Sequence, residues 1–428
     1  MSTILLPPTN QKRVVIIGCG FGGLELAANL EGTDFQVVLF DKNNYHTFQP
    51  LLYQVATAGL EAESIAYPVR KFFRKHQNVI FRFGEVHSVD LEQKKIITSI
   101  GECPYDYLVI ATGTSTNFFG NQEIEKNALP MKTLREALTI RALVLRKLEQ
   151  ATLTEDNAER ASLMSFAVVG GGPTGVELAG ALCELKNHVL PNDYPDLDFT
   201  KMKVYLIESG AGVLQMFTPE HQQKAIQYLK ELGAEILLNT RVNAYDGKQI
   251  LIDKNQPIPA QTLIWAAGIK GNEINGISAD LQVGGKRYIV DEFNRIKKLD
   301  SVFAIGDIAC MTTEKFPKGH PQVAQPAMQQ GAHLAKNLIA LESGKQLTPF
   351  EYKDLGSMAT VGRNRAVAEI GKIHLSGFLG WASWLAVHLV QLTGHRNRLM
   401  VFVNWIWNYI NYDRNIRLII GGGKAEKK

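Results

Sequence analysis

The chain has 428 residues, of which 45% are hydrophobic and 21% are charged. These values are typical of a globular protein with a substantial core and two or three domains. A net charge of +4, with no block of lysine or arginine, argues against nucleic-acid binding.

The cysteines are scattered and form no C-x-x-C or C-x4-C pair: Cys19, Cys103, Cys183 and Cys310. This spacing excludes zinc fingers, iron–sulfur ligation and the adjacent dithiol of disulfide reductases, so we expect no metal. Residues 1–11 contain only a three-residue apolar stretch, far too short for a signal peptide. We therefore expect the body of the protein to be soluble and intracellular.

The first elements form a nucleotide-binding pattern. The apolar run 14–17 predicts a buried strand, and a glycine turn with Gly18, Gly20 and Gly23 follows it and opens a helix. The glycines permit a tight turn, close approach to a pyrophosphate and helix–strand packing. A second strand, 36–40, ends at Asp41, near the position expected for a ribose-binding acid.

The segment that follows is less regular. Residues 45–59 are aromatic-rich with little charge, and by themselves indicate a loop packed beneath a lid. Residues 65–74 indicate a helix, and three short strands precede a buried strand that ends in Ala111-Thr112-Gly113. A glycine at such a strand end lets the backbone approach a ligand closely.

An amphipathic packing helix is predicted over 134–149, followed by a polar connection over 155–162. The pattern of the first elements then repeats. An apolar run, 166–169, precedes a second glycine turn with Gly170, Gly172 and Gly175, and Glu177 matches Glu25 of the first copy.

The next strand ends at the acid Glu208, and the closing strand ends in Ala267-Gly268. This internal repeat predicts an α/β fold with two Rossmann-like dinucleotide-binding domains.

A further strand ends at Gly306-Asp307, which places a carboxylate beside a backbone that a ligand can approach. A helix is then predicted from Ala324 to about Leu341. Gln325 and Gln329 lie four residues apart and share one face of it, which without context indicates a pair of surface amides.

The C-terminal part holds four of the five tryptophans, within the apolar segments 378–392 and 399–410, with Arg414 and Arg417 beyond them. Each segment is shorter than the roughly 20 residues that span a bilayer. The pattern favours an amphipathic helical anchor in a membrane interface. A buried homodimer interface and a spanning helix are the alternatives.

Taken together, these motifs resemble those of the type II NADH dehydrogenases, single-subunit NADH:quinone oxidoreductases of respiratory membranes and members of the two-dinucleotide-binding-domain flavoproteins. The resemblance covers nearly the whole chain. It implies an FAD-binding domain at 1–125 and 295–345, an NADH-binding domain at 126–294, and a quinone-site and membrane-anchoring region at 346–428. It also implies a peripheral, monotopic protein on the cytoplasmic face of a bacterial inner membrane.

The resemblance assigns FAD to the first turn and NADH to the second. For non-covalent FAD it implies Gly18, Gly20, Gly23, Asp41, Thr112, Gly113 and Asp307, with the helix start at Gln325 near the flavin. For NADH it implies Gly172, Gly175, Glu208, Ala267 and Gly268. Glu208 is followed by Ser209-Gly210 and no arginine, which favours NADH over NADPH.

In this family the quinone pocket involves the Ala-Gln-x-Ala-x-Gln stretch and the C-terminal helices, so Gln325 and Gln329 become candidate quinone residues. Glu177 becomes the candidate catalytic residue, coupled to quinone protonation. Its alternative is an acid that favours the helix dipole. Nothing in these residues separates menaquinone from ubiquinone, and the lack of a long apolar span gives no support to proton pumping.

Three other functions stay open at this point. A sulfide:quinone oxidoreductase would share the fold and tail but needs paired reactive cysteines. A soluble NADH:acceptor flavoprotein reductase, or a redox-sensing binding protein of this fold, would not need the tryptophan-rich tail.

Overall fold

The computed structural model describes residues 2–253, 256–411 and 416–419. Contacts divide the chain into two compact units. Unit 1 holds 1–46, 67–115 and 269–354, and unit 2 holds 47–66, 116–268 and 355–428. Arg414, predicted to flank the anchor, lies outside the described residues.

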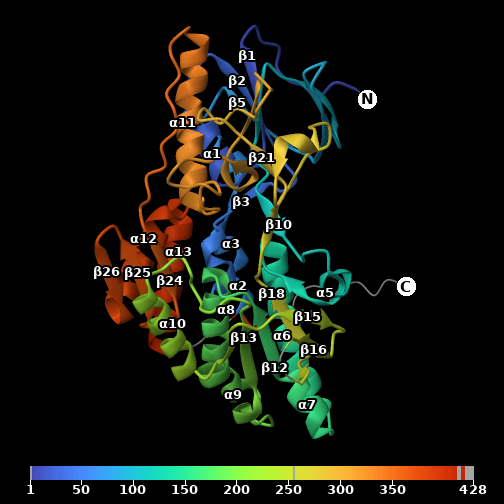
Figure 1. Cartoon of the computed structure of the whole chain (residues 1–428), viewed down its shortest axis with the longest axis vertical. Coiled ribbons are helices and arrows are strands. Elements are labelled where there is room, and N and C mark those ends of the chain that lie inside the picture. The colour runs from blue at the N-terminus through green and yellow to red at the C-terminus, as the bar shows by residue number, and fades with distance from the viewer. Residues whose placement is uncertain (1, 254–255, 412–415, 420–428) are drawn as a thin grey trace. The chain divides into compact units, whose positions relative to one another are not determined.

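Unit 1 is built on a parallel five-stranded sheet (Figure 1). Its order is β22 (Val302–Ala304), β9 (Tyr107–Ile110), β1 (Lys12–Ile17), β2 (Phe35–Asp41), β5 (Val79–Phe83). Residues 14–17 of β1 and 37–40 of β2 are buried, and each of these stretches is a continuous apolar run, as a strand covered on both faces requires. The parallel pairing brings the strand ends at Ile17, Asp41 and Ile110 to one edge of the sheet.

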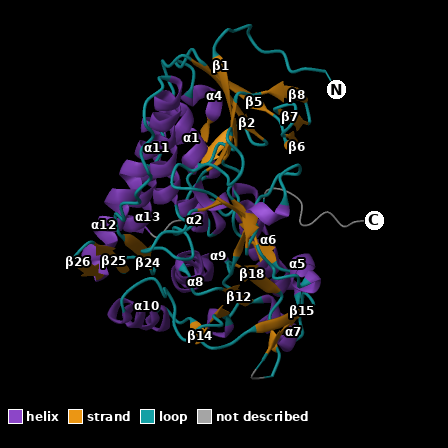
Figure 2. Ribbon diagram, turned by 45° about the horizontal axis from the view of Figure 1, so that its top comes forward, coloured by secondary structure: helices purple, strands orange, loops and turns teal. Residues whose placement is uncertain are grey.

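Two helices pack closely in unit 1, α1 (Phe21–Asn29) and α11 (Ala324–Glu342), and Figure 2 shows them side by side. Glycine makes this approach possible. A Cβ on Gly331 of α11 would lie 2.5 Å from the carbonyl oxygen of Gly22 in α1. The predicted helix from Ala324 is confirmed.

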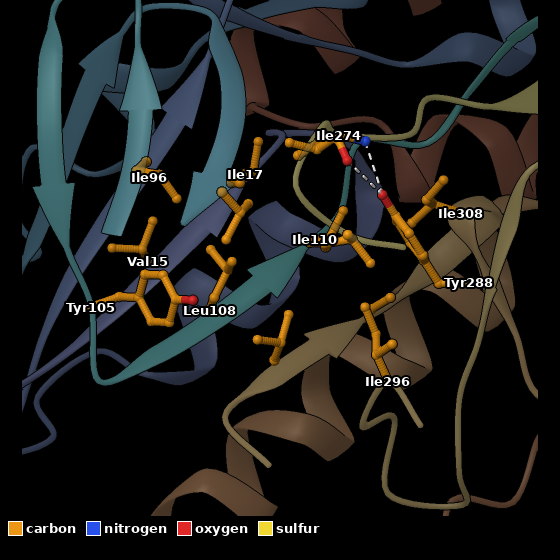
Figure 3. Close-up of a cluster of buried hydrophobic side chains, with 14 of the residues drawn as sticks. Val15, Ile17, Ile96, Tyr105, Leu108, Ile110, Ile274, Tyr288, Ile296 and Ile308 are labelled. Atoms are coloured by element: carbon orange, nitrogen blue, oxygen red, sulfur yellow. Dashed lines mark hydrogen bonds between the residues drawn. The ribbon is translucent and has the colours of Figure 1, made fainter. Parts of the chain in front are cut away.

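The sheet covers a buried core whose side chains come from β1, β9 and the segments around Ile274 and Tyr288 (Figure 3). The Tyr288 hydroxyl accepts the main-chain N–H of Ile274 at 2.8 Å and donates to its carbonyl at 3.3 Å. A buried tyrosine is thereby satisfied within an otherwise apolar cluster.

The remaining elements of unit 1 are short. They are α4 (Val69–Phe72), β6 (Val86–Asp90), β7 (Lys95–Thr98), β8 (Gly101–Pro104), β19 (Ile269–Gly271), β20 (Gln282–Val283), β21 (Arg287–Ile289), β23 (Ala309–Cys310), and the 3-10 turns Ala279–Leu281 and Gly306–Ile308. Three strands cross the boundaries between units: β3 (Tyr45–Thr47), β4 (Ala66–Pro68) and β10 (Thr114–Thr116).

Unit 2 repeats the architecture with a second parallel sheet. Its order is β11 (Leu129–Pro130), β18 (Thr262–Trp265), β12 (Ser165–Val169), β13 (Lys203–Ile207), β14 (Glu235–Leu237). The succession β18-β12-β13-β14 matches β9-β1-β2-β5 of unit 1, and α8 (Pro173–Glu184) matches α1. The predicted pair of Rossmann-like domains is confirmed.

The helix predicted over 134–149 exists as α6 (Leu134–Leu153), which begins with a capping box between Thr133 and Glu136. Two other predictions were wrong. The polar connection holds helix α7 (Asn157–Leu163), because Asp156 caps the N–H groups of Ala158 and Glu159.

The helix predicted over 65–74 is the second error. The chain forms α3 (Ala62–Ile65), then β4 and α4, because Pro68 has no N–H to donate and forces its predecessor out of helical geometry.

The C-terminal part of unit 2 consists of strands β24 (Ser357–Thr360), β25 (Ala366–Ile370) and β26 (Ile373–Ser376), followed by helices α12 (Gly377–Gln391) and α13 (His395–Asn411). In Figure 1 this red group lies beside α8 and α10 (Pro219–Glu231). Both predicted tail helices are confirmed as helices. No described helix combines the length and hydrophobicity needed to cross a bilayer.

Unit 2 also contains several minor elements. They are α2 (Leu52–Ala56), α5 (Gln122–Asn127), α9 (Leu190–Asp193), the π-helical turn Leu185–Val189, the 3-10 turns Gln49–Leu51 and Phe199–Lys201, β15 (Val242–Tyr245), β16 (Gln249–Ile252) and β17 (Ile258–Pro259).

Candidate functional site

The first glycine turn has the geometry that a pyrophosphate requires. Gly18 has a φ of +105°, and a Cβ there would overlap the Ala111 carbonyl oxygen. A Cβ on Gly23 would overlap the carbonyl oxygen of Gly18, so the helix packs directly on the turn.

Gly20 differs from the other two glycines, because no described atom lies within 4 Å of its Cβ position. It caps α1 without a side-chain hydrogen bond from any described residue. The N–H groups at this helix N-terminus are therefore left for an anion.

Asp41 lies at the end of β2, and its carboxylate holds the glycine turn. It accepts the main-chain N–H of Cys19 at 2.6 Å and that of Asn43 at 2.7 Å. Burial raises the pKa of Asp41, while these two N–H donors oppose the rise. The acid therefore fixes the turn and lies beside it, as a ribose-binding residue must.

Thr112 and Gly113 are fixed by Asn272, a residue that the sequence reasoning missed. The Asn272 amide donates to the Thr112 carbonyl at 2.9 Å, and the Thr112 hydroxyl donates to the Asn272 carbonyl at 2.7 Å. Gly113 has a φ of +63°, and its carbonyl accepts the Asn272 N–H at 3.0 Å. These bonds thus fix the end of the strand in a positive-φ conformation, which glycine adopts readily.

Asp307 follows β22 in a short turn. Its carboxylate accepts the hydroxyl of Thr114 at 3.0 Å. Gly306 has a φ of +74°, and its N–H donates at 2.7 Å to Gln330, a buried residue of α11. Gln330 was not predicted. In the sequence it resembles the neighbouring amides of α11, and only its burial and this bond reveal its role.

Gln325 and Gln329 share one face of α11, as predicted, and both amides have partners within unit 1. The Gln325 amide oxygen accepts the Tyr352 hydroxyl at 3.2 Å. Gln329 exchanges two hydrogen bonds with the main chain of Lys353, at 2.9 and 3.0 Å. The two amides thus hold the segment that follows α11.

The second glycine turn repeats the first in unit 2. Gly170 has a φ of +114°, and a Cβ there would lie 2.8 Å from the carbonyl of Ala266. A Cβ on Gly175 would overlap the Gly170 carbonyl oxygen, while the Cβ position of Gly172 is open. Within the described chain no side chain caps α8 at Gly172, so this helix N-terminus can also receive a phosphate.

Glu208 takes the same place as Asp41. Its carboxylate accepts the N–H of Gly171 at 2.6 Å, just as Asp41 accepts that of Cys19, and it also accepts the N–H of Gly210 at 2.6 Å. Each acid therefore binds the residue between the first two glycines of its turn. This shared bond is the structural basis of the internal repeat.

Ala267 and Gly268 follow β18 at the same sheet edge as the second turn. Gly268 has a φ of +74°, and a Cβ there would overlap the Phe119 ring. The Phe119 side chain is 69% exposed, so it covers Gly268 from the solvent side. The predicted NADH residues thus gather in unit 2.

Glu177 lies in the first turns of α8 and is only 7% exposed. Burial raises its pKa to about 8, so the carboxyl group is protonated at neutral pH. The Thr360 N–H, 3.4 Å away, and the indole N–H of Trp384 both oppose the rise. The indole N–H nevertheless falls short of hydrogen-bond geometry with any described residue. Glu25 differs, because it is half-buried and bonded to Asn29.

A pocket of about 110 Å³ lies next to these partners of Glu177, within unit 2. Its wall holds five aromatic side chains among polar and small residues, and comes from α2, the end of α8, the β24–β25 hairpin, α12 and α13. It includes Tyr53, Gln54, Glu184, Thr360, Arg363, Trp381, Trp384, Trp405 and Tyr409. The Trp405 indole donates to Gln54 at 2.8 Å, and the Arg363 guanidinium lies 4.0 Å from the centre of the Tyr409 ring. No local pattern in the sequence indicates this convergence.

His388 of α12 stacks on Trp384, with ring centroids 4.0 Å apart. Burial lowers the pKa of His388 to about 4, so its ring is neutral at physiological pH. The stack therefore positions Trp384 without adding a positive charge beside Glu177.

Helix α13 is amphipathic, with polar side chains facing the protein and apolar side chains facing outward. Three asparagines face the protein: Asn397 donates to the carbonyls of Glu63 and Ala66, Asn404 to Glu61, and Asn408 to the Gly59 carbonyl. The outward side chains are apolar and exposed, among them Leu399, Phe402, Val403, Ile406, Trp407 and Ile410. An apolar face of this kind marks an interaction surface.

The four cysteines are all free and buried. Burial raises the pKa of Cys19 well above its usual value, that of Cys103 to about 11 and that of Cys183 to about 12. Such thiols are poor nucleophiles. Within the described residues no group of three acidic, histidine or cysteine side chains could hold a metal ion.

Comparison with known families agrees with this geometry. Residues 12–331 match the pyridine nucleotide-disulphide oxidoreductase family, and residues 355–412 match the NDH2 C-terminal domain. The first match covers both glycine turns, and the second covers the hairpin and helices that surround the pocket.

The chain is 35% identical to the type II NADH:quinone oxidoreductase Ndh of Mycobacterium tuberculosis, over 95% of this chain and 90% of that protein. It is 36% identical to NdhA of the same organism, over 92% and 86%.

Among solved structures, NDH2 from Plasmodium falciparum in complex with NADH has a TM-score of 0.88 at 23% identity, covering 96% of this chain and 100% of that one. The sulfide:quinone oxidoreductase of Aquifex aeolicus shares the fold with a TM-score of 0.71 at 20% identity, covering 93% and 95%. The sequence matches and the two glycine turns together show that this chain belongs to the type II NADH dehydrogenase family.

Proposed function

We propose that this chain is a non-proton-pumping NADH:quinone oxidoreductase in which the two glycine turns bind FAD and NADH and Glu177 supplies a proton to the quinone. FAD held at the first turn would supply a hydride acceptor for NADH and a two-electron donor for the quinone. The observation that carries the assignment is the repeated turn, each copy held by an acid on the N–H between its first two glycines.

The FAD residues act by holding the cofactor. The open N-terminus of α1 at Gly20 suits a pyrophosphate, with Gly18 and Gly23 fixing the turn, and Asp41 suits a ribose. Thr112, Gly113 and Asp307 present a rigid backbone and a carboxylate for the rest of the cofactor. In this proposal residues 1–125 and 295–345 form the FAD-binding domain.

The NADH residues lie within 126–294, the proposed NADH-binding domain. Gly172 and Gly175 form the phosphate turn, and Ala267 and Gly268 form the neighbouring strand end. Glu208 carries a negative charge at the ribose position, so it favours a 2′-hydroxyl over a 2′-phosphate.

Glu177 is suited to donate a proton. Its carboxyl group is protonated at neutral pH, and two N–H groups from Thr360 and Trp384 face it and can stabilise the carboxylate left behind. The adjacent aromatic pocket suits a planar quinone ring, and we assign the quinone headgroup to it. Gln325 and Gln329 remain proposed quinone contacts, and Gln325 a proposed flavin contact.

We place the enzyme at a membrane surface, as a peripheral protein on the cytoplasmic face of a bacterial inner membrane, with 346–428 as the quinone-site and anchoring region. The exposed apolar face of α13 and the exposed Arg396 at its start support a lipid partner. A homodimer formed through the same face is the second candidate.

The alternatives fit less well. A sulfide:quinone oxidoreductase needs reactive thiols, whereas the four cysteines here are buried, and burial raises the pKa values of Cys19, Cys103 and Cys183. The proposal is tested by replacing Trp405 with alanine, which removes one wall of the pocket. We expect the KM for quinone to rise about tenfold, the equivalent of about 1.4 kcal/mol, with flavin reduction by NADH unchanged. An unchanged KM for quinone would contradict the pocket assignment.

A further inference from the structure

Helix α8 carries a second carboxylate on the face that bears Glu177. Glu177, Gly180, Ala181 and Glu184 recur at steps of three and four, so they lie along one side of the helix. The two small residues between the acids let the β24–β25 hairpin approach. A Cβ on Gly180 would lie 3.1 Å from the main-chain nitrogen of Gly362.

The hairpin donates to both acids. The Thr360 N–H lies 3.4 Å from Glu177, and the Arg363 N–H donates to Glu184 at 2.5 Å. Ala181, Glu184 and Thr360 line the same pocket, together with Gly362 and Trp384. The pocket therefore runs along the helix face, from the partners of Glu177 to Glu184 itself.

The two acids differ in their access to solvent. Glu177 is 7% exposed, whereas Glu184 is half-buried. Trp384 adjoins both the pocket and Glu177. The indole N–H of Trp384 is buried, lines the pocket and has no acceptor at hydrogen-bond geometry among the described residues.

We propose that Glu184 delivers from solvent the proton that Glu177 donates to the quinone, through water in the pocket between them. This inference rests on the proposed role of Glu177. The overall reaction, NADH + H⁺ + quinone → NAD⁺ + quinol, takes up one proton per turnover. Glu177 loses that proton to the reduced quinone, Glu184 passes its own proton to Glu177, and solvent reprotonates Glu184.

The dimensions agree with such a relay. Seven residues of helix separate the two acids by about 10 Å along the axis. A volume of about 110 Å³ accommodates about three water molecules of about 30 Å³ each. About three waters at hydrogen-bond spacings of about 2.8 Å span that separation. The path is available once the quinol has left the pocket.

The test compares Glu184→Gln, Glu184→Asp and Glu177→Gln in the FAD-loaded protein by stopped-flow absorbance. Glutamine keeps the acceptor for the Arg363 N–H but carries no proton for transfer. For Glu184→Gln we expect the first reoxidation of the flavin by a short-chain quinone to stay normal, because Glu177 starts protonated. Steady-state turnover with excess NADH and quinone should slow on the order of 10- to 100-fold, with flavin reduction by NADH unchanged. Added formate should restore part of the rate, and Glu184→Asp should keep most of it. Glu159→Gln, on the exposed surface of α7, is the control.

The outcomes separate the relay from the function on which it rests. Normal steady-state turnover in Glu184→Gln, with slow reoxidation in Glu177→Gln, would overturn the relay alone. Slow steady-state turnover in Glu184→Gln that formate does not relieve would also overturn it, because the effect would then be structural. Normal reoxidation in Glu177→Gln would overturn the proposed role of Glu177.

Discussion

The main-chain N–H of Thr360 lies 3.4 Å from a carboxyl oxygen of Glu177, and burial raises the pKa of that carboxyl group to about 8. The proton-donating form is therefore present below about pH 8 and is lost above it. We predict that flavin reoxidation by quinone slows as the pH rises through about 8. In Glu177→Gln the reoxidation rate should be on the order of 10- to 100-fold lower, and it should not show this decrease as the pH rises. Single-turnover rates measured from about pH 6 to about pH 10 check the prediction.

The same carboxyl group affects stability. Because the pKa of Glu177 is about 8 in the folded state and 4.5 for an ordinary glutamate, the folded state binds the extra proton between these values. Stability contributed by Glu177 thus falls as the pH rises across this window, by at most about 1.4 kcal/mol per pH unit. Between about pH 5 and about pH 8, the Tm of the parent should fall relative to the Tm of Glu177→Gln, which has no carboxyl group to titrate. A constant difference would contradict the raised pKa.

Glycine substitutions in the second turn should separate folding from binding. A Cβ on Gly170 meets the Ala266 carbonyl at 2.8 Å, and its φ is +114°. Gly170→Ala should therefore lose at least about 2 kcal/mol of stability. Gly172→Ala has open space and an ordinary φ of −71°, so it should fold normally and raise the KM for NADH. Thermal unfolding and steady-state kinetics measure the two effects. Equal losses of Tm in Gly170→Ala and Gly172→Ala would contradict the assignment of Gly170 to folding and Gly172 to binding.

Glu208 should determine the preference for NADH. Glu208→Gln can still accept the N–H of Gly171 or Gly210 but carries no charge. Like charges a few ångströms apart near a protein surface repel by about 1–4 kcal/mol. We predict that the ratio of kcat/KM for NADPH to that for NADH rises at least about tenfold. An unchanged ratio would contradict the placement of Glu208 at the ribose of NADH.

The outward face of α13 should carry membrane binding. Each apolar side chain contributes about 1.5 kcal/mol or more when buried. We predict that replacing Leu399, Ile406 and Ile410 together by serine reduces binding to anionic vesicles on the order of 10³-fold. The control is Leu5 and Leu153 replaced by serine, since these are also exposed. Unchanged vesicle binding, with conversion of a dimer to a monomer in sedimentation, would favour the homodimer instead.

Much of the fold could be predicted because its signals are local. Buried parallel strands are continuous apolar runs, and three glycines with a following acid need no distant residue to be seen. Helix α7 and the break at Pro68 were missed, since a single cap or proline outweighs the average character of a segment.

The site was less predictable where it depends on burial and on contacts between distant segments. Gln330 and Asn272 are ordinary amides in the sequence, and their bonds to Gly306 and Thr112 exist only in the folded chain. The pocket joins α2, α8 and the C-terminal helices, although the bonded pair of α2 and α13 is 351 residues apart in the sequence. Glu177 is proposed as the catalytic residue on family resemblance, and its raised pKa, which follows from packing, could not be predicted from the sequence.

The most direct measurement is stopped-flow spectroscopy of the FAD-loaded protein, mixed first with NADH and then with a quinone. We predict that NADH bleaches the flavin absorbance and that the quinone restores it, with one quinol formed for each NADH oxidised. Flavin that stays oxidised in NADH, or that stays reduced in the presence of quinone, would contradict the account.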